Sequence, residues 1–226
     1  MTIEELKRKK DFVITPKGGI LCGYTGRDTS VVLKHVEELK KAGVKPPPSI
    51  PMFYPKSPQG ICMLDELFVQ GVKTSGEVEF VLILDEENLC VGLGSDHTDR
   101  ELEQIDILKS KQVCPAVVSK SFWSYEEISN HWDQIEIRSW AVDDGVKTLY
   151  QEARLSSILS PEQLLSEVRE RIQGSLQEIF IFSGTPPLIT DGFLFPERFE
   201  CVLTDPVLNR EIGLGYSIHT LDWFKG

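Results

Sequence analysis

Residues 76–96, GEVEFVLILDEENLCVGLGSD, contain the pattern that decides the fold. Two mainly apolar runs, residues 77–84 and 90–93, have the length and composition of β-strands and flank the polar sequence DEEN. A polar turn between two such runs predicts a β-hairpin. Because side chains two apart in a strand face the same side, we expect Glu77 and Glu79 to project together near the start of this hairpin.

The remaining chain predicts further strands with three clear helices among them. The strand patterns cover residues 12–15, 19–24, 66–72, 135–142, 146–150, 177–183, 199–203 and 215–219. The helical patterns cover residues 30–42, 99–109 and 161–173, with a shorter one at 124–132. The clearest helix has Ser160 as its N-cap, Pro161 in its first turn and Gln163 completing a capping box. These patterns predict an α+β, mainly β fold that begins with an N-terminal hairpin.

Composition and charge restrict the class of protein. A chain of 226 residues with 41% hydrophobic content can bury a sizeable core, and we divide it into an N-terminal segment, 1–45, and a core, 46–226. The formal charge of -11 argues against nucleic acid or an anionic membrane as a partner. There is no apolar run of about 20 residues and no signal-peptide core, so we expect a cytoplasmic protein. The five cysteines form no C-x-x-C pair and are expected to be reduced.

Glu77 and Glu79 are the first candidate site. Two carboxylates on one strand face repel each other unless a positive charge lies between them, and a divalent cation would supply it. Ligands that are all oxygen favour Mg²⁺ or Mn²⁺ over zinc. The alternative, more common for an isolated E-x-E pair, is a solvated strand face.

Three further positions are chemically ambiguous from sequence alone. In GSDHTDR, Asp96 and Asp99 are each either a helix N-cap or a further metal carboxylate, and His97 is more typical of a hydrogen-bonded structural residue. In SGTP, the backbone N–H groups and the Thr185 hydroxyl could hold a carboxylate, or the motif is a plain strand-ending turn.

The helical pattern 30–42 contributes one more candidate pair, His35 and Glu38. Spaced three residues apart, they lie side by side on the helix surface. They form either a catalytic pair or an ordinary solvated face.

In their order along the chain, these motifs resemble the fumarylacetoacetate hydrolase superfamily. The matching pieces are GYTGRD, H-x-x-E, E-x-E, SDHTDR, a lysine ahead of Cys114-Pro115, Tyr150-Gln151 and a strand ending in G-T-P. TGRD, HVEEL, TSGEVE, GSDHTDRELE, SKQVCP, YQE and SGTP are similar to a largely uncharacterised bacterial branch. The resemblance extends from about residue 20 to about residue 216, and it implies a fumarylacetoacetase C-terminal-like mixed β-roll with peripheral helices, usually a homodimer.

The resemblance also implies roles for individual residues. It assigns the metal to Glu77, Glu79 and Asp96, catalysis to His35, Glu38 and Lys111, and substrate binding to Arg27, Arg100, Gln151 and Thr185. Lys109 is an alternative to Lys111 as the site lysine. The chain departs from the family pattern at Ser95, which replaces an asparagine, and in a longer segment between Arg27 and His35.

The activity implied by the resemblance is the Mg²⁺- or Mn²⁺-dependent hydrolysis of a carbon–carbon bond in a small 2-oxo or 2,4-dioxo acid, of the acylpyruvate or fumarylacetoacetate type. His35, oriented by Glu38, would deprotonate water, and Lys111 and Arg100 would stabilise developing negative charge. Decarboxylase, hydratase, dehydratase and isomerase activities on a related 2-oxo acid are alternatives at the same site. A non-catalytic organic-acid-binding protein is the alternative from another class.

Overall fold

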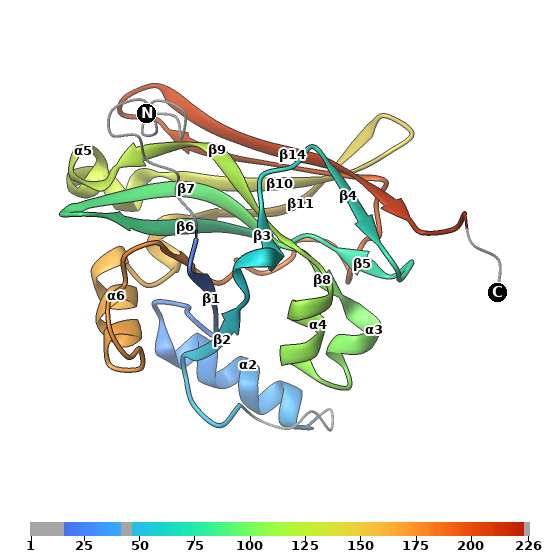
Figure 1. The fold of residues 1–226 in the computed structure, drawn as a ribbon, viewed down its shortest axis with the longest axis horizontal. Helices are drawn as coiled ribbons and strands as arrows, with labels where there is room; N and C mark the ends of the chain where they lie inside the picture. Colours follow the sequence, from blue (N-terminus) through green and yellow to red (C-terminus); the bar gives the residue numbers. More distant parts are fainter. Residues whose placement is uncertain (1–15, 42–46, 224–226) are drawn as a thin grey trace.

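The computed structural model describes residues 16–41 and 47–223, and their strands form two large sheets and one small one (Figure 1). The seven-stranded sheet has the order β2 (Met52–Lys56), β1 (Gly18–Gly23), β12 (Ile179–Phe182), β6 (Val78–Asp85), β7 (Asn88–Asp96), β9 (Ala116–Ser124) and β3 (Ile61–Cys62). The five-stranded sheet has the order β11 (Val146–Arg154), β10 (Glu136–Asp143), β13 (Arg198–Asp205), β14 (Arg210–Thr220) and β4 (Glu66–Val69). The small sheet pairs β5 (Thr74–Ser75) with β8 (Thr98–Asp99).

Short helices lie around these sheets (Figure 1). They are α2 (Thr29–Lys41), α3 (Arg100–Glu103), α4 (Ile107–Val113), α5 (Tyr125–Ile128) and α6 (Pro161–Arg169), with 3-10 turns η1 (Pro58–Gly60), η2 (Ser129–Gln134) and η3 (Leu155–Ser157). Both large sheets are mixed, because β1 runs parallel to β12 and β4 runs parallel to β14, while most other pairs are antiparallel. The predicted α+β, mainly β fold class is confirmed.

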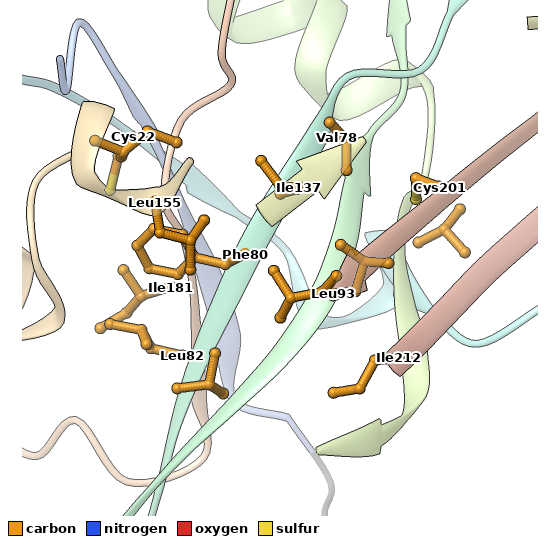
Figure 2. Close-up of a cluster of buried hydrophobic side chains, with 14 of the residues drawn as sticks. Cys22, Val78, Phe80, Leu82, Leu93, Ile137, Leu155, Ile181, Cys201 and Ile212 are labelled. Atoms are coloured by element: carbon orange, nitrogen blue, oxygen red, sulfur yellow. The ribbon is translucent and has the colours of Figure 1, made fainter. Parts of the chain in front are cut away.

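The main hydrophobic core lies between the two large sheets. Figure 2 shows part of this cluster, which includes Val78, Phe80 and Leu82 of β6, Ile137 of β10 and Cys201 of β13. Removing such side chains from water stabilises the fold by roughly 1.5–3 kcal/mol for each large apolar residue. A second cluster, which covers the opposite face of β6, contains its alternate residues Val81 and Ile83. Burial on both faces explains why residues 80–84 of β6 form a continuous apolar run.

The predicted hairpin of residues 76–96 is confirmed. β6 and β7 pair from Val78 opposite Ser95 to Asp85 opposite Asn88, around the DEEN turn. The capping box at Ser160 is also present, although α6 ends at Arg169 rather than at residue 173.

Several elements differ from the prediction: the short strands β2, β3, β5 and β8 were not predicted, and two larger differences have a physical reason. The helix expected over 99–109 is divided into α3 and α4, because the Asp106 side chain accepts a hydrogen bond from Lys109 N and starts a new helix. Ile105, between the two helices, is exposed. Strand β9 was not predicted: it is buried over most of its length and contains a register shift opposite Gly92–Gly94, so it lacks a simple alternating pattern.

Parts of the N-terminal predictions lie outside the described residues. The strand at 12–15 falls there, so the N-terminal hairpin stays a prediction. The division at residue 45 also stays a prediction, although β1 lies inside the seven-stranded sheet, between β2 and β12. All five cysteines are free thiols. In the part of the chain that the structure describes, no helix is long and apolar enough to cross a membrane.

Candidate metal centre

Glu77, Glu79 and Asp96 converge at one end of the β6–β7 hairpin. Glu77 immediately precedes β6, Glu79 lies on it, and Asp96 ends β7. The backbone joins them directly, because Asp96 N donates to Glu77 O at 3.0 Å. One oxygen from each side chain lies within 4.8 Å of the others. The predicted convergence of three carboxylates from distant positions in the sequence is therefore present.

The alternation of β6 explains which way Glu79 points. Val78 and Phe80 enter the inter-sheet core, so Glu79 shares the opposite face with Val81. Gly94, which pairs with Glu79, leaves room on this face: a Cβ there would lie 2.4 Å from Val81 Cγ2.

Each carboxylate has one close polar partner. Glu77 Oε1 lies 3.2 Å from the Arg100 guanidinium, and Asp96 Oδ2 accepts a hydrogen bond from Lys111 Nζ. Glu79 Oε2 accepts from Gly184 N at 2.7 Å. Gly184 has φ +84°, and a Cβ there would lie 2.3 Å from Thr25 Oγ1. The SGTP break thus holds a carboxylate, as one reading of the motif predicted, but the carboxylate is that of Glu79.

The charges and unpaired atoms of this cluster fit a divalent cation. Three acidic side chains face two cationic ones. The pKa of Glu79 is raised well above its usual value, mainly because the side chain is buried and secondly because of the negative charge of Asp96. Asp96 Oδ1 is buried and has no hydrogen-bond partner among the described residues. An all-oxygen donor set with one unused oxygen suits Mg²⁺ or Mn²⁺, so these three residues could hold such an ion.

Arg100 organises the site rather than presenting a free cation. Its side chain is buried, Nε donates to Ser75 Oγ at 2.8 Å, and NH1 donates to Glu103 at 2.8 Å. NH2 faces Glu77, and the ring centroid of Phe193 lies 4.1 Å from the guanidinium carbon. All three nitrogens therefore contact protein groups and position Glu77, and the predicted substrate-binding role of Arg100 stays a prediction.

The structure distinguishes the two candidate lysines. Lys111 is buried against Asp96, whereas the side chain of Lys109 is 74% exposed and lies 3.2 Å from Asp106. Although burial opposes its charge, Asp96 and Glu77 raise the pKa of Lys111 above its ordinary value. Lys111 is therefore the cation placed beside the carboxylates.

Gln151 is fully occupied by the protein. Its Nε2 donates to Thr185 Oγ1 at 2.6 Å and Pro186 O at 2.9 Å, and its Oε1 accepts from Val78 N and Ser139 Oγ, both at 3.0 Å. A primary amide has two N–H donors and two acceptor positions, so none remains for a ligand. Gln151 therefore joins β11 to β6 and to the SGTP segment, and its predicted substrate-binding role stays a prediction.

Replacing Gln151 with leucine should lower the free energy of unfolding by about 2–4 kcal/mol, because buried partners such as Val78 N–H and Pro186 O lose their hydrogen bonds. Urea denaturation of the metal-free protein measures this. Gln173→Leu, at an exposed position, is the control and should change stability by less than about 0.5 kcal/mol. Equal effects of the two substitutions would contradict the structural role.

Thr185 and Arg27 also direct their polar groups at protein atoms. The Thr185 hydroxyl donates to Val78 O at 2.9 Å. The Arg27 guanidinium donates to Asp133 at 2.9 Å and to Leu155 O and Ile158 O. It lines a separate cavity of about 350 Å³, so the structure does not bring the Arg27 side chain to the three carboxylates.

His35 and Glu38 lie on α2, but their side chains are outside the described part of the structure. Their catalytic role therefore stays a prediction.

His97 and Asp99 have structural roles. His97 Nδ1 lies 2.9 Å from Tyr216 Oη, which is itself 2.9 Å from Ser95 Oγ. Burial, then the charge of Arg100, lowers the pKa of His97 to about 3. Asp99 accepts hydrogen bonds from Glu101 N and Leu102 N, which confirms the N-cap alternative for this residue.

Two contributors to the site were not predicted. They are Ser75, which holds Arg100, and Lys56, a buried lysine whose ammonium donates to Lys111 O and to Cys114 O at 2.5 Å. Ser75 acts through a single hydroxyl, which leaves no recognisable spacing. Lys56 follows the letters MFYP, and a lysine at a strand end is usually exposed.

Comparison with solved structures identifies the architecture as that of fumarylacetoacetate hydrolase family proteins. A yeast protein of this family, ynq8, has a TM-score of 0.62 and 17% identity, with 91% of this chain and 94% of that chain covered. A 2-keto-3-deoxy-D-arabinonate dehydratase complexed with magnesium and 2,5-dioxopentanoate has a TM-score of 0.63 and 15% identity, covering 96% and 80%. A protein named Cg1458 has a TM-score of 0.65 and 13% identity, covering 91% and 77%.

A family profile gives the more specific assignment. Residues 22–216 match the family described as protein of unknown function, DUF2848, and the chain belongs to this family. The curated proteins contain no match to the chain.

Proposed function

We propose that this protein is a divalent-metal-dependent enzyme that hydrolyses a carbon–carbon bond in a small 2-oxo or 2,4-dioxo acid. The observation that carries this proposal is the triad of the partly buried Glu77 with the buried Glu79 and Asp96, which has surplus negative charge and an Asp96 oxygen with no hydrogen-bond partner among the described residues. An organic acid bearing adjacent carboxylate and carbonyl oxygens is suited to the remaining coordination positions of a hard cation.

The residues of this chain would have distinct roles in metal binding, charge stabilisation and proton transfer. Glu77, Glu79 and Asp96 would hold Mg²⁺ or Mn²⁺, which when bound would act as a Lewis acid toward the carbonyl oxygen. Lys111 would stabilise negative charge that develops nearby. His35, oriented by Glu38, would accept a proton from water, a step worth roughly 10²–10⁴-fold in rate. The homodimer implied by the resemblance belongs to the same proposal.

The second candidate is a dehydratase acting on a sugar-derived 2-oxo acid. It is favoured by the similar fold of the 2-keto-3-deoxy-D-arabinonate dehydratase, which was crystallised with magnesium.

Product analysis with Mg²⁺ and Mn²⁺ distinguishes these reactions. Hydrolysis of an acylpyruvate would consume water and release pyruvate and a carboxylic acid, whereas dehydration of a sugar-derived 2-oxo acid would release water and keep the carbon chain intact. Oxaloacetate, whose decarboxylation gives pyruvate and carbon dioxide, completes the panel. Binding of these acids without turnover of any would favour the organic-acid-binding alternative.

Adding Mg²⁺ or Mn²⁺ should raise the thermal midpoint of the metal-free protein. An ion present at 100 times its dissociation constant stabilises the folded state by about 2.7 kcal/mol, which corresponds to roughly 5–10 °C for a chain of this size. Differential scanning fluorimetry after chelation measures the shift, with Na⁺ at equal ionic strength as the control. No shift with either divalent ion would contradict the metal site.

A further inference from the structure

Lys56 is buried without a carboxylate in direct contact among its described hydrogen bonds. It ends β2, and its ammonium donates to two backbone carbonyls, Lys111 O and Cys114 O. Burial lowers its pKa from the ordinary value, while the charge of Asp96 acts in the opposite direction. Burying a lysine ammonium costs free energy, so the hydrogen bonds that it makes must offset this cost.

The two carbonyls lie at the C-terminal end of α4. This end of a helix has unpaired carbonyls and a partial negative charge, both of which a cation satisfies. The same helix carries Lys111, whose ammonium binds Asp96. Lys56 therefore fixes the backbone from which the Lys111 side chain extends.

The surroundings of Lys56 are adapted to its side chain. A Cβ at Gly60 would lie 2.6 Å from Lys56 Cε and 3.3 Å from its Nζ, so only glycine leaves the stem in place. Tyr54, two residues earlier on β2, is also buried, and its ring centroid lies 6.0 Å from Lys111 Nζ. Strand β2 therefore approaches Lys111 at two points. Lys56 binds the backbone carbonyl of Lys111, and the Tyr54 ring lies near the Lys111 ammonium.

We infer that Lys56 is a positioning residue that holds Lys111 against Asp96 and so sets the affinity of the carboxylate triad for a divalent cation. This inference rests on the proposed metal-dependent function. Because the Lys111 ammonium on Asp96 Oδ2 repels a cation that would bind at Oδ1, loosening Lys111 strengthens metal binding.

Gly60→Ala tests this role without changing any charge, because the added methyl displaces the Lys56 stem. Titration of Mn²⁺ by isothermal calorimetry should give about 3-fold tighter binding for Gly60→Ala and about 10-fold tighter binding for Lys111→Met, since a nearby positive charge is removed. In the Lys111→Met background, Gly60→Ala should have no further effect, because coupled residues are non-additive. Gly213→Ala, where nothing lies within 4 Å, is the control and should leave binding unchanged.

A metal-free measurement separates this inference from the proposed function. Acetic anhydride labelling followed by mass spectrometry should modify Lys111 slowly in the wild type and several-fold faster in Gly60→Ala, with Lys109 unchanged. If the wild type fails to bind Mn²⁺, the proposed metal-dependent function is refuted. The labelling of the metal-free protein still shows whether Lys56 holds Lys111 in place. The inference would be overturned if Gly60→Ala left the labelling of Lys111 unchanged. It would also be overturned if Gly60→Ala changed the Mn²⁺ affinity equally in the wild-type and Lys111→Met backgrounds. Lys56→Met provides the same comparison if Gly60→Ala does not fold.

Discussion

Asp96→Asn should weaken Mg²⁺ and Mn²⁺ binding by roughly 100-fold or more, above the 10–100-fold that loss of an outer-shell partner typically costs. Asp96 contributes an oxygen that has no hydrogen-bond partner within residues 16–41 and 47–223, and it also neutralises the buried Lys111. An asparagine removes the negative charge and leaves the lysine ammonium unpaired beside the site. Both changes oppose binding of a cation.

Asp99→Asn is the matched control for this prediction. Asp99 lies three residues further on and caps α3, and asparagine is an equally good N-cap, so both metal affinity and stability should change little. Isothermal titration calorimetry of the two variants at one pH measures the difference. Equal affinities for wild type and Asp96→Asn would show that the cation, if any, binds elsewhere.

The central part of the fold could be predicted because local pattern and tertiary packing agree there. The apolar runs on either side of DEEN predicted the hairpin that carries Glu77 and Glu79, and side-chain alternation predicted that the two glutamates share a face. β9 could not be predicted in the same way. Its burial depends on neighbours on both faces and on a register shift against β7, and neither is encoded in a short periodic pattern.

The residues that converge at the site could be predicted from the sequence, but the protein contacts of its polar side chains could not. The three carboxylates and Lys111 do converge, but Arg100 and Gln151 use their hydrogen-bonding groups on Ser75, Glu103, Pro186 and other protein atoms. Whether a polar side chain faces a ligand or the protein depends on what packs against it in three dimensions. Spacing along the chain does not contain this information.

Arg100→Met should lower the free energy of unfolding of the metal-free protein by about 3–5 kcal/mol, the usual cost of removing one partner of a buried ion pair. Without the guanidinium, Glu77 and Glu103 lose their contacts at 3.2 and 2.8 Å, and the Ser75 hydroxyl loses its donor. Methionine preserves much of the side-chain volume. The loss therefore reports mainly on charge and hydrogen bonding.

Arg154→Met is the control for Arg100→Met. Arg154 lies 3.8 Å from Glu136, but its side chain is 66% exposed, so this pair should contribute less than about 1 kcal/mol. Urea denaturation in the presence of a chelator compares the two variants. A loss for Arg100→Met as small as that for Arg154→Met would mean that water replaces the guanidinium and that Glu77 does not depend on Arg100 for its position. A loss in the expected range would instead make Arg100 part of the scaffold that brings Glu77 to the other two carboxylates before any cation binds.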